Sequence, residues 1–149
     1  MIYQRIIVAA DGSSVSELAL HEAIRLAQDQ KASIRIIHIV DENYVNSSET
    51  NIDYPTLWQA YREEGIKFLD EVSEKVRQAK IPFDCRLIEI KPFAGKIAEK
   101  IVEAAKEWSA DLLVLGTHGR RGFNHFLLGS VAEHVIRSAS TPILLIRGQ

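Results

Sequence analysis

The segment GTHGRRGFNHFLLGS, which runs from Gly116 to Ser130, holds residue types suited to binding a phosphate group. It contains four of the chain's eight glycines, together with two adjacent arginines and a serine. It follows the apolar run DLLVL and precedes SVAEHVIRSA, whose apolar spacing predicts a helix. A loop that leads from a strand into a helix exposes unpaired backbone N–H groups at the positive end of the helix dipole, which attracts phosphate.

Individual residues of this segment fit that chemistry. Glycine lets the backbone approach an anion closely and adopt a positive φ without a Cβ clash. Ser130 stands at the expected N-cap, so its hydroxyl either caps the helix or contacts a phosphate oxygen. Arg120 and Arg121 add charge that would screen a polyphosphate, and His118 stands where it could touch one. Because GxxxxGKS/T and GxGxxG are both absent, two interpretations stay open: a nucleotide-binding loop, or a glycine-rich turn with a capping serine.

The rest of the chain alternates short β-branched runs with longer amphipathic runs, and these are the elements that must position the loop. The pattern predicts strands at residues 5–10, 33–40, 84–90, 111–116 and 143–147, and helices at residues 16–30, 56–80, 92–108 and 130–139. Strands separated by helices run parallel, and near-continuous apolar strands suit a sheet that is covered on both faces. The sequence therefore predicts an α/β fold, a doubly wound open five-stranded parallel sheet flanked by four helices, in one domain over residues 1–149.

In such a sheet, ligands bind beyond the carboxyl ends of the strands, at the point where the strand order reverses. Asp11 follows the first predicted strand and the glycine-rich segment follows the fourth, so both lie at carboxyl ends. The polar stretch from Asp41 to Pro55 follows the second strand and has no clear period. It has two interpretations: a loop that closes over a ligand, or a loop that meets a protein partner.

The composition argues against several other classes of function. The formal net charge is -2 and the aromatic residues are not interleaved with basic ones, so no nucleic-acid partner is expected. Cys85 has no second cysteine to pair with and is interpreted as a small buried hydrophobe. His118, His125 and His134 lack the close spacing of metal ligands, so no metal site is expected. A secretory signal pattern and a run of about 18 apolar residues are both absent, which favours a cytoplasmic protein without membrane insertion.

The glycine-rich segment also resembles the motif of a known family. Gly116-Thr-His-Gly119, nine residues and then Gly129-Ser130 resemble the Gly-x2-Gly-x9-Gly-(Ser/Thr) signature of the ATP-binding branch of the universal stress protein family. IIVAADGS resembles that family's first strand and aspartate turn, and SVAEHVIRSASTPILLIR resembles its closing helix and strand. The resemblance covers essentially the whole chain, and its one mild departure is an alanine pair before the aspartate, where many members have valine or proline.

The resemblance implies a strand order of 3-2-1-4-5 and a molecule of ATP in the cleft between strands one and four. It implies that Asp11 faces the ribose and adenine and that the backbone of Val40 meets the adenine. The residues that it implies for the ribose and phosphates, or for the adjoining cleft, are Gly116, Gly119, Arg120, Gly129, Ser130 and Val131. Any Mg2+ is expected to be held mainly by the phosphates and water.

The family resemblance also implies a homodimer, formed through the C-terminal strand from Ile143 to Arg147. An apolar edge strand of this kind would otherwise invite aggregation. The favoured function is a stress-response regulator that binds ATP, offers a nucleotide-dependent surface and has an unidentified regulatory partner. The alternative is a slow ATPase or a nucleotidyl-transfer enzyme. Efficient phosphoryl transfer is not expected, because the sequence places neither a Walker lysine nor a carboxylate near the loop.

Overall fold

The computed structural model describes residues 2–45, 51–118 and 128–148, and within them it contains five strands and four α-helices. The strands are β1 (Arg5–Ala9), β2 (Ser33–Asp41), β3 (Phe83–Ile90), β4 (Leu112–Gly116) and β5 (Ile143–Ile146). The helices are α1 (Ser14–Gln30), α2 (Tyr54–Gln78), α3 (Ile97–Glu107) and α4 (Ser130–Ser138), with a short 3-10 helix, η1 (Glu42–Tyr44), after β2. The predicted alternation of strands and helices is confirmed.

The strands form one sheet in the order β3-β2-β1-β4-β5, and every neighbouring pair is parallel. Ile6 in the central strand β1 is aligned with Ile34 of β2 on one side and with Leu112 of β4 on the other. The chain winds from β1 to β3 in one direction and then returns to place β4 on the other side of β1. The order therefore reverses between β1 and β4, as the family resemblance implies.

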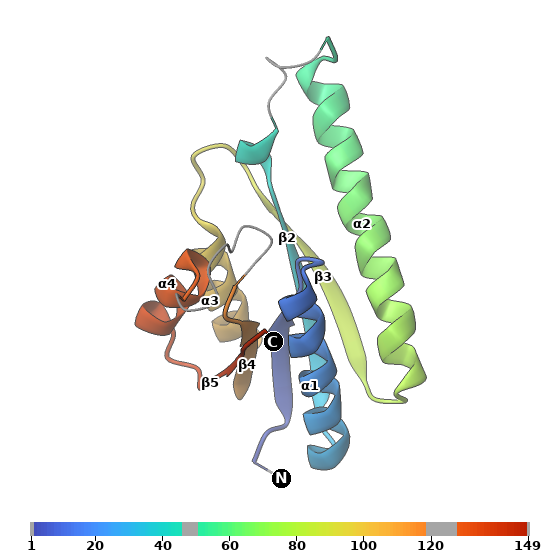
Figure 1. Ribbon diagram of the computed structural model, residues 1–149, viewed down its shortest axis with the longest axis vertical. Helices are drawn as coiled ribbons and strands as arrows, with labels where there is room; N and C mark the ends of the chain where they lie inside the picture. The colour runs from blue at the N-terminus through green and yellow to red at the C-terminus, as the bar shows by residue number, and fades with distance from the viewer. Residues whose placement is uncertain (1, 46–50, 119–127, 149) are drawn as a thin grey trace.

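Two pairs of helices cover the two faces of the sheet (Figure 1). Ile6 and Val8 of β1 pack in the core beneath α1 and α2, whereas Ile7 packs in the core beneath α3 and α4. All three side chains are fully buried. Because successive side chains of a strand point to opposite faces, a strand buried on both faces must be apolar at every position.

Three helices begin at residues other than those predicted, and one of them, α2, begins at Tyr54 instead of residue 56. Helix α3 begins at Ile97 instead of residue 92, because Phe93 has φ 61° and Gly95 has φ 126°, which are not helical. Residues 91–96 instead form a turn before the helix. Helix α1 begins earlier than predicted, at Ser14, because the Ser13 hydroxyl accepts a hydrogen bond from the backbone N–H of Ser16 at 3.1 Å and caps the helix.

Helix α2 is 25 residues long and packs closely on β2 at Gly65. A Cβ atom at Gly65 would lie 2.8 Å from Cγ1 of Val40 and 3.2 Å from Cδ1 of Leu87. The glycine that the sequence places inside this helix therefore permits the helix to approach the sheet. Within the described part of the chain, no helix is long and apolar enough to cross a membrane.

Candidate functional site

A pocket of about 540 Å³ lies at the carboxyl ends of the central strands. Residues that follow β1 and β4 line it, together with the end of β2 and the first residues of α3 and α4. The pocket therefore occupies the point where the strand order reverses, which is the usual ligand site of a doubly wound sheet. One end of it is formed by the start of α4 and the other by isoleucine and tyrosine side chains.

The start of helix α4 forms the first end of the pocket, where Ser130 and Val131 line it. Gly129 is the N-cap and its N–H donates to the carbonyl of Thr117 at 2.8 Å. Ser130 is the first residue of the helix, so the prediction that Ser130 is the N-cap is wrong by one position. The N–H groups of the first turn lack carbonyl partners within the helix, and the dipole adds partial positive charge, so this end suits an anion.

The packing at Gly129 and Gly116 leaves little room for side chains. A Cβ atom at Gly129 would lie 2.9 Å from the carbonyl oxygen of Thr117. A Cβ atom at Gly116 would lie 2.7 Å from Cγ1 of Val15 and 3.3 Å from the carbonyl oxygen of His118. Glycine at position 129 therefore lets the start of α4 pack against the backbone that follows β4, and glycine at position 116 leaves room for the Val15 side chain of α1.

Residues Thr117 and His118 continue the wall of the pocket beyond β4. The Thr117 hydroxyl and Nδ1 of His118 are 3.0 Å apart, and Thr117 is buried. The sequence did not single out Thr117, although it stands between two predicted site residues. Its backbone carbonyl accepts the hydrogen bond from Gly129 and so holds the start of α4 at this end of the pocket.

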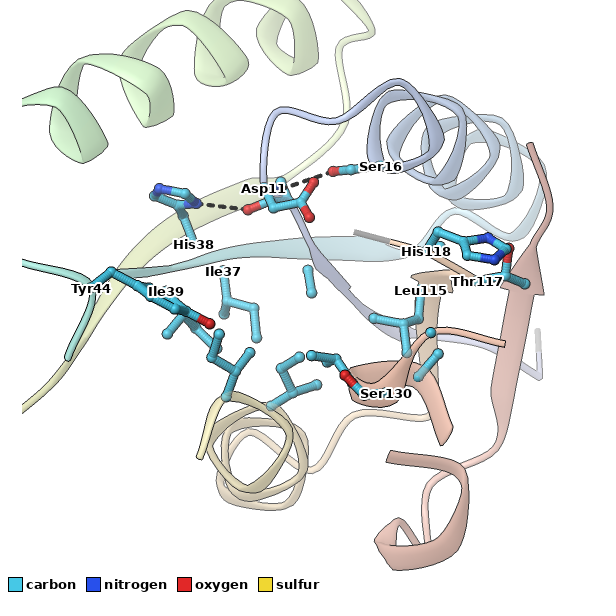
Figure 2. A pocket seen from close by; sticks show the side chains of 18 of the residues that line it. Asp11, Ser16, Ile37, His38, Ile39, Tyr44, Leu115, Thr117, His118 and Ser130 are labelled. Atoms are coloured by element: carbon cyan, nitrogen blue, oxygen red, sulfur yellow. Dashed lines mark hydrogen bonds between the residues drawn. The ribbon is translucent and has the colours of Figure 1, made fainter. Parts of the chain in front are cut away.

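Asp11 lies between the two ends of the pocket, where β1 leads into α1 (Figure 2). Its Oδ1 accepts hydrogen bonds from the backbone N–H of Ser13 at 2.9 Å and from the Ser13 hydroxyl at 2.6 Å. Its own N–H donates to the hydroxyl of Ser16 at 3.0 Å. These contacts fix the carboxylate beside the pocket, where it can accept hydrogen bonds from the hydroxyl groups of a ligand.

The second end of the pocket is mainly apolar and aromatic. It is lined by Ile39 of β2, Tyr44 of η1, Tyr61 of α2 and the isoleucines Ile97 and Ile101 of α3. Sequence reasoning did not predict the two tyrosines. The available signal was an aromatic residue, Tyr44, a few residues after the carboxyl end of the second strand, in a stretch that carried no periodic pattern.

His38 lies beneath this apolar end and is buried. Its Nδ1 lies 2.7 Å from the carbonyl oxygen of Ala10, and its ring centroid lies 4.7 Å from that of Phe68. Because a carbonyl can only accept, Nδ1 carries the proton in this contact. The hydrogen bond joins β2 to the turn before Asp11, so His38 supports the pocket wall.

A model of the universal stress protein family matches residues 2–147 of this chain. The chain belongs to the universal stress protein family. A universal stress protein of Methanocaldococcus jannaschii is 32% identical over 146 residues, which span 98% of this chain and 83% of that protein.

Solved structures of universal stress proteins share the fold. A family member from Burkholderia pseudomallei is 33% identical with a TM-score of 0.78, and the match covers 99% of this chain and 98% of the other. A universal stress protein solved in complex with cAMP is 26% identical with a TM-score of 0.68, and the match covers both chains completely. The match to solved universal stress protein structures therefore covers at least 99% of this chain.

The pocket brings together most of the site residues that the sequence and its family resemblance singled out. Those that line it are Asp11, Gly116, His118, Gly129, Ser130 and Val131. The side chain of Val40 packs towards Gly65 of α2, and its neighbour Ile39 lines the pocket instead, so the backbone contact of Val40 with a base stays a prediction. Gly119 and Arg120 lie outside the described residues.

Proposed function

We propose that this universal stress protein binds an adenine nucleotide in the pocket between β1 and β4, with ATP as its ligand in the cell. The observation that carries the proposal is the contact of Gly129 with Thr117, which directs the start of α4 into the pocket and has no room for a Cβ atom. An anion at that position would accept hydrogen bonds from backbone N–H groups of the first helical turn.

The other groups of a nucleotide also fit the pocket. The carboxylate of Asp11 can accept hydrogen bonds from ribose hydroxyls, and the isoleucine and tyrosine end suits a planar base. A related protein, 26% identical over the whole chain, was solved in complex with cAMP, which carries the same base, ribose and phosphate groups. This relationship supports an adenine nucleotide as the ligand class.

We further infer that nucleotide binding serves regulation rather than turnover. Among the described residues, no group of three or more His, Cys, Asp or Glu side chains could hold a metal ion together. As the sequence suggests, we expect any Mg2+ ion bound with ATP to be coordinated mainly by phosphate oxygens and water. Phosphoryl transfer requires a positioned nucleophile as well as metal-held phosphates, and we do not expect efficient turnover. We expect instead that nucleotide occupancy alters a surface that an unidentified regulatory protein recognises. A cytoplasmic location stays a prediction of the sequence.

The same proposal includes a homodimer formed through β5, at the edge of the sheet. The carbonyl oxygen of Pro142 accepts a hydrogen bond from the N–H of Leu113 in β4, and that of Ile146 accepts one from the N–H of Thr117, the residue after β4, at 2.9 Å each. Because backbone groups alternate in direction along a strand, those of Ile143 and Leu145 face away from β4 and suit pairing with a second copy. Sedimentation should show a dimer, and Leu145→Pro, which removes one outward N–H, should shift it towards monomer.

Calorimetry tests the nucleotide proposal. Protein freed of copurified nucleotide is titrated with ATP in the presence of Mg2+, and the mixture is then analysed for ADP by chromatography over several hours. Saturable binding without ADP formation is expected. No binding would overturn the nucleotide assignment, whereas rapid ADP formation would favour the alternative of an ATPase.

A further inference from the structure

Tyr44 and Tyr61 both line the apolar end of the pocket, from different elements of the chain. Tyr44 belongs to η1, beyond the end of β2, and Tyr61 to the first half of α2. In Figure 2, Tyr44 enters the pocket on the same side as Ile39. Tyr44 retains 44% of its surface exposed, so much of this aromatic side chain is available to a ligand or to solvent.

The backbone that carries Tyr44 is held by a compact set of hydrogen bonds. Oδ1 of Asp41 accepts from the backbone N–H of Asn43 at 2.9 Å and from its side-chain amide at 2.8 Å. The N–H of Val45 donates to the carbonyl of Glu42 at 3.1 Å, which closes the turn. Asp41 and Glu42 are both buried, so η1 is anchored to the end of β2 and presents Tyr44 from a defined position.

The walls around Tyr44 suit a flat aromatic ligand. Ile39 of β2 and Ile97 of α3 supply aliphatic surface at the same end of the pocket, while the start of α4 supplies N–H groups at the other end. A ligand that places its charged group at α4 would extend a planar base towards the tyrosines. Base stacking on an aromatic ring uses the π-face that every nucleobase has.

We propose that Tyr44 stacks on the base of the bound nucleotide and supplies a large share of the affinity for that base. This inference rests on the proposed nucleotide-binding function and assigns a role to a residue of the 41–55 stretch. The sequence left two interpretations of that stretch, contact with a ligand or with a protein partner. The inference favours contact with the ligand for its first part, η1. Because stacking tolerates any base, Tyr44 contributes to the affinity for AMP and GMP alike.

The first experiment compares Tyr44→Ala with the unaltered protein by calorimetry, using AMP and ribose 5-phosphate as ligands. Loss of one base-stacking contact lowers the affinity for AMP by about 5- to 150-fold. The affinity for ribose 5-phosphate, which has no base, is expected to stay within a factor of about two of the unaltered value. That factor corresponds to about 0.4 kcal/mol of binding free energy, which is too small for a lost contact. Tyr44→Phe should retain AMP affinity because the ring is kept.

A second readout reports stacking directly. The H2 and H8 protons of AMP should shift upfield in the NMR spectrum when AMP binds the unaltered protein, because a ring stacked on the base shields them. Tyr44→Ala should remove most of that shift at saturating protein. Phe93→Ala is the matched control, since Phe93 is an almost fully exposed aromatic side chain that does not line the pocket.

The outcomes distinguish a failure of the proposed nucleotide-binding function from a failure of the role assigned to Tyr44. If the unaltered protein does not bind AMP, the proposed function fails and the role of Tyr44 fails with it. If it binds AMP and Tyr44→Ala leaves both affinity and ring-current shift unchanged, only the role of Tyr44 is overturned. An equal loss of affinity for AMP and ribose 5-phosphate would also overturn it, because that loss would come from a displaced η1.

Discussion

Replacement of Gly129 by alanine should weaken nucleotide binding by moving the start of α4. The added Cβ would lie 2.9 Å from the carbonyl oxygen of Thr117 and 3.4 Å from Cα of His118. Both neighbours are backbone atoms, so no side-chain rotation can relieve the contact. The φ of Gly129 is -64°, which alanine adopts readily, so the effect comes from the close contact alone.

The size of the effect follows from the contacts at stake. Overpacking of this kind costs about 1–3 kcal/mol of folding free energy. A displaced helix start should also lose about one hydrogen bond to the charged phosphate, worth about 1.5–3 kcal/mol, which is about a 10- to 150-fold loss of AMP affinity. Adenosine, which has no phosphate, should lose much less.

The assay is calorimetric titration of Gly129→Ala with AMP and with adenosine, alongside thermal unfolding. Val76→Ala is the control, because Val76 is fully buried near the C-terminal end of α2, whereas the residue of α2 that lines the pocket, Tyr61, lies in the first half of the helix. That variant should lose about 2 kcal/mol of stability and keep its affinity. Unchanged AMP affinity in Gly129→Ala, or an equal loss for adenosine and AMP, would refute the reasoning.

Three further predictions concern the stability and reactivity of the fold. Gly65→Ala should lower the free energy of unfolding by about 1–3 kcal/mol in urea denaturation, because its Cβ would lie 2.8 Å from Cγ1 of Val40; an unchanged midpoint would contradict the packing. The bidentate contact with Arg35 lowers the pKa of Asp84 from its usual 3.8, so this ion pair stabilises the fold above about pH 4 and its contribution is lost as the pH falls through the lowered pKa. Asp84 is 40% exposed and screened by solvent, so Asp84→Asn should lower the free energy of unfolding by only about 0.5–1 kcal/mol near neutral pH, and by less near pH 3. An equal loss at both pH values would exclude the ion pair as the cause. Partial burial raises the pKa of the Cys85 thiol, so this thiol should react with a disulfide reagent more slowly in the native protein than in denaturant. Equal rates would contradict its partial burial.

The sequence predicted the elements and their direction because those depend on local apolar patterns. It could not choose the order of the strands, since an alternating pattern is compatible with several arrangements, and the order came from the family resemblance. The predicted start of α3 was wrong. Residues 92–96 carry a proline and an alanine that suit a first helical turn, but the backbone takes positive φ at Phe93 and Gly95. Helix boundaries depend on such single dihedral angles.

Some residues of the candidate site could be predicted from the sequence and others could not. Asp11, Gly116 and Gly129 were found because they stand at or just after the carboxyl end of a strand, or directly before a helix, where sequence position alone places them at the carboxyl edge. Tyr44 and Tyr61 were missed because their approach to one pocket depends on the 3-10 turn after β2 and on how the long helix α2 lies against the sheet. Neither relation leaves a periodic pattern in the residues.

An NMR titration with AMP is the most direct test of the central claim that the pocket between β1 and β4 binds a nucleotide. The backbone amides of Ser130, Val131 and Asp11 should show the largest shifts, whereas amides near Val76 at the far end of α2 should not move. That distribution would place the phosphate at the start of α4. Saturable shifts centred elsewhere, or no shifts at millimolar AMP, would contradict the account.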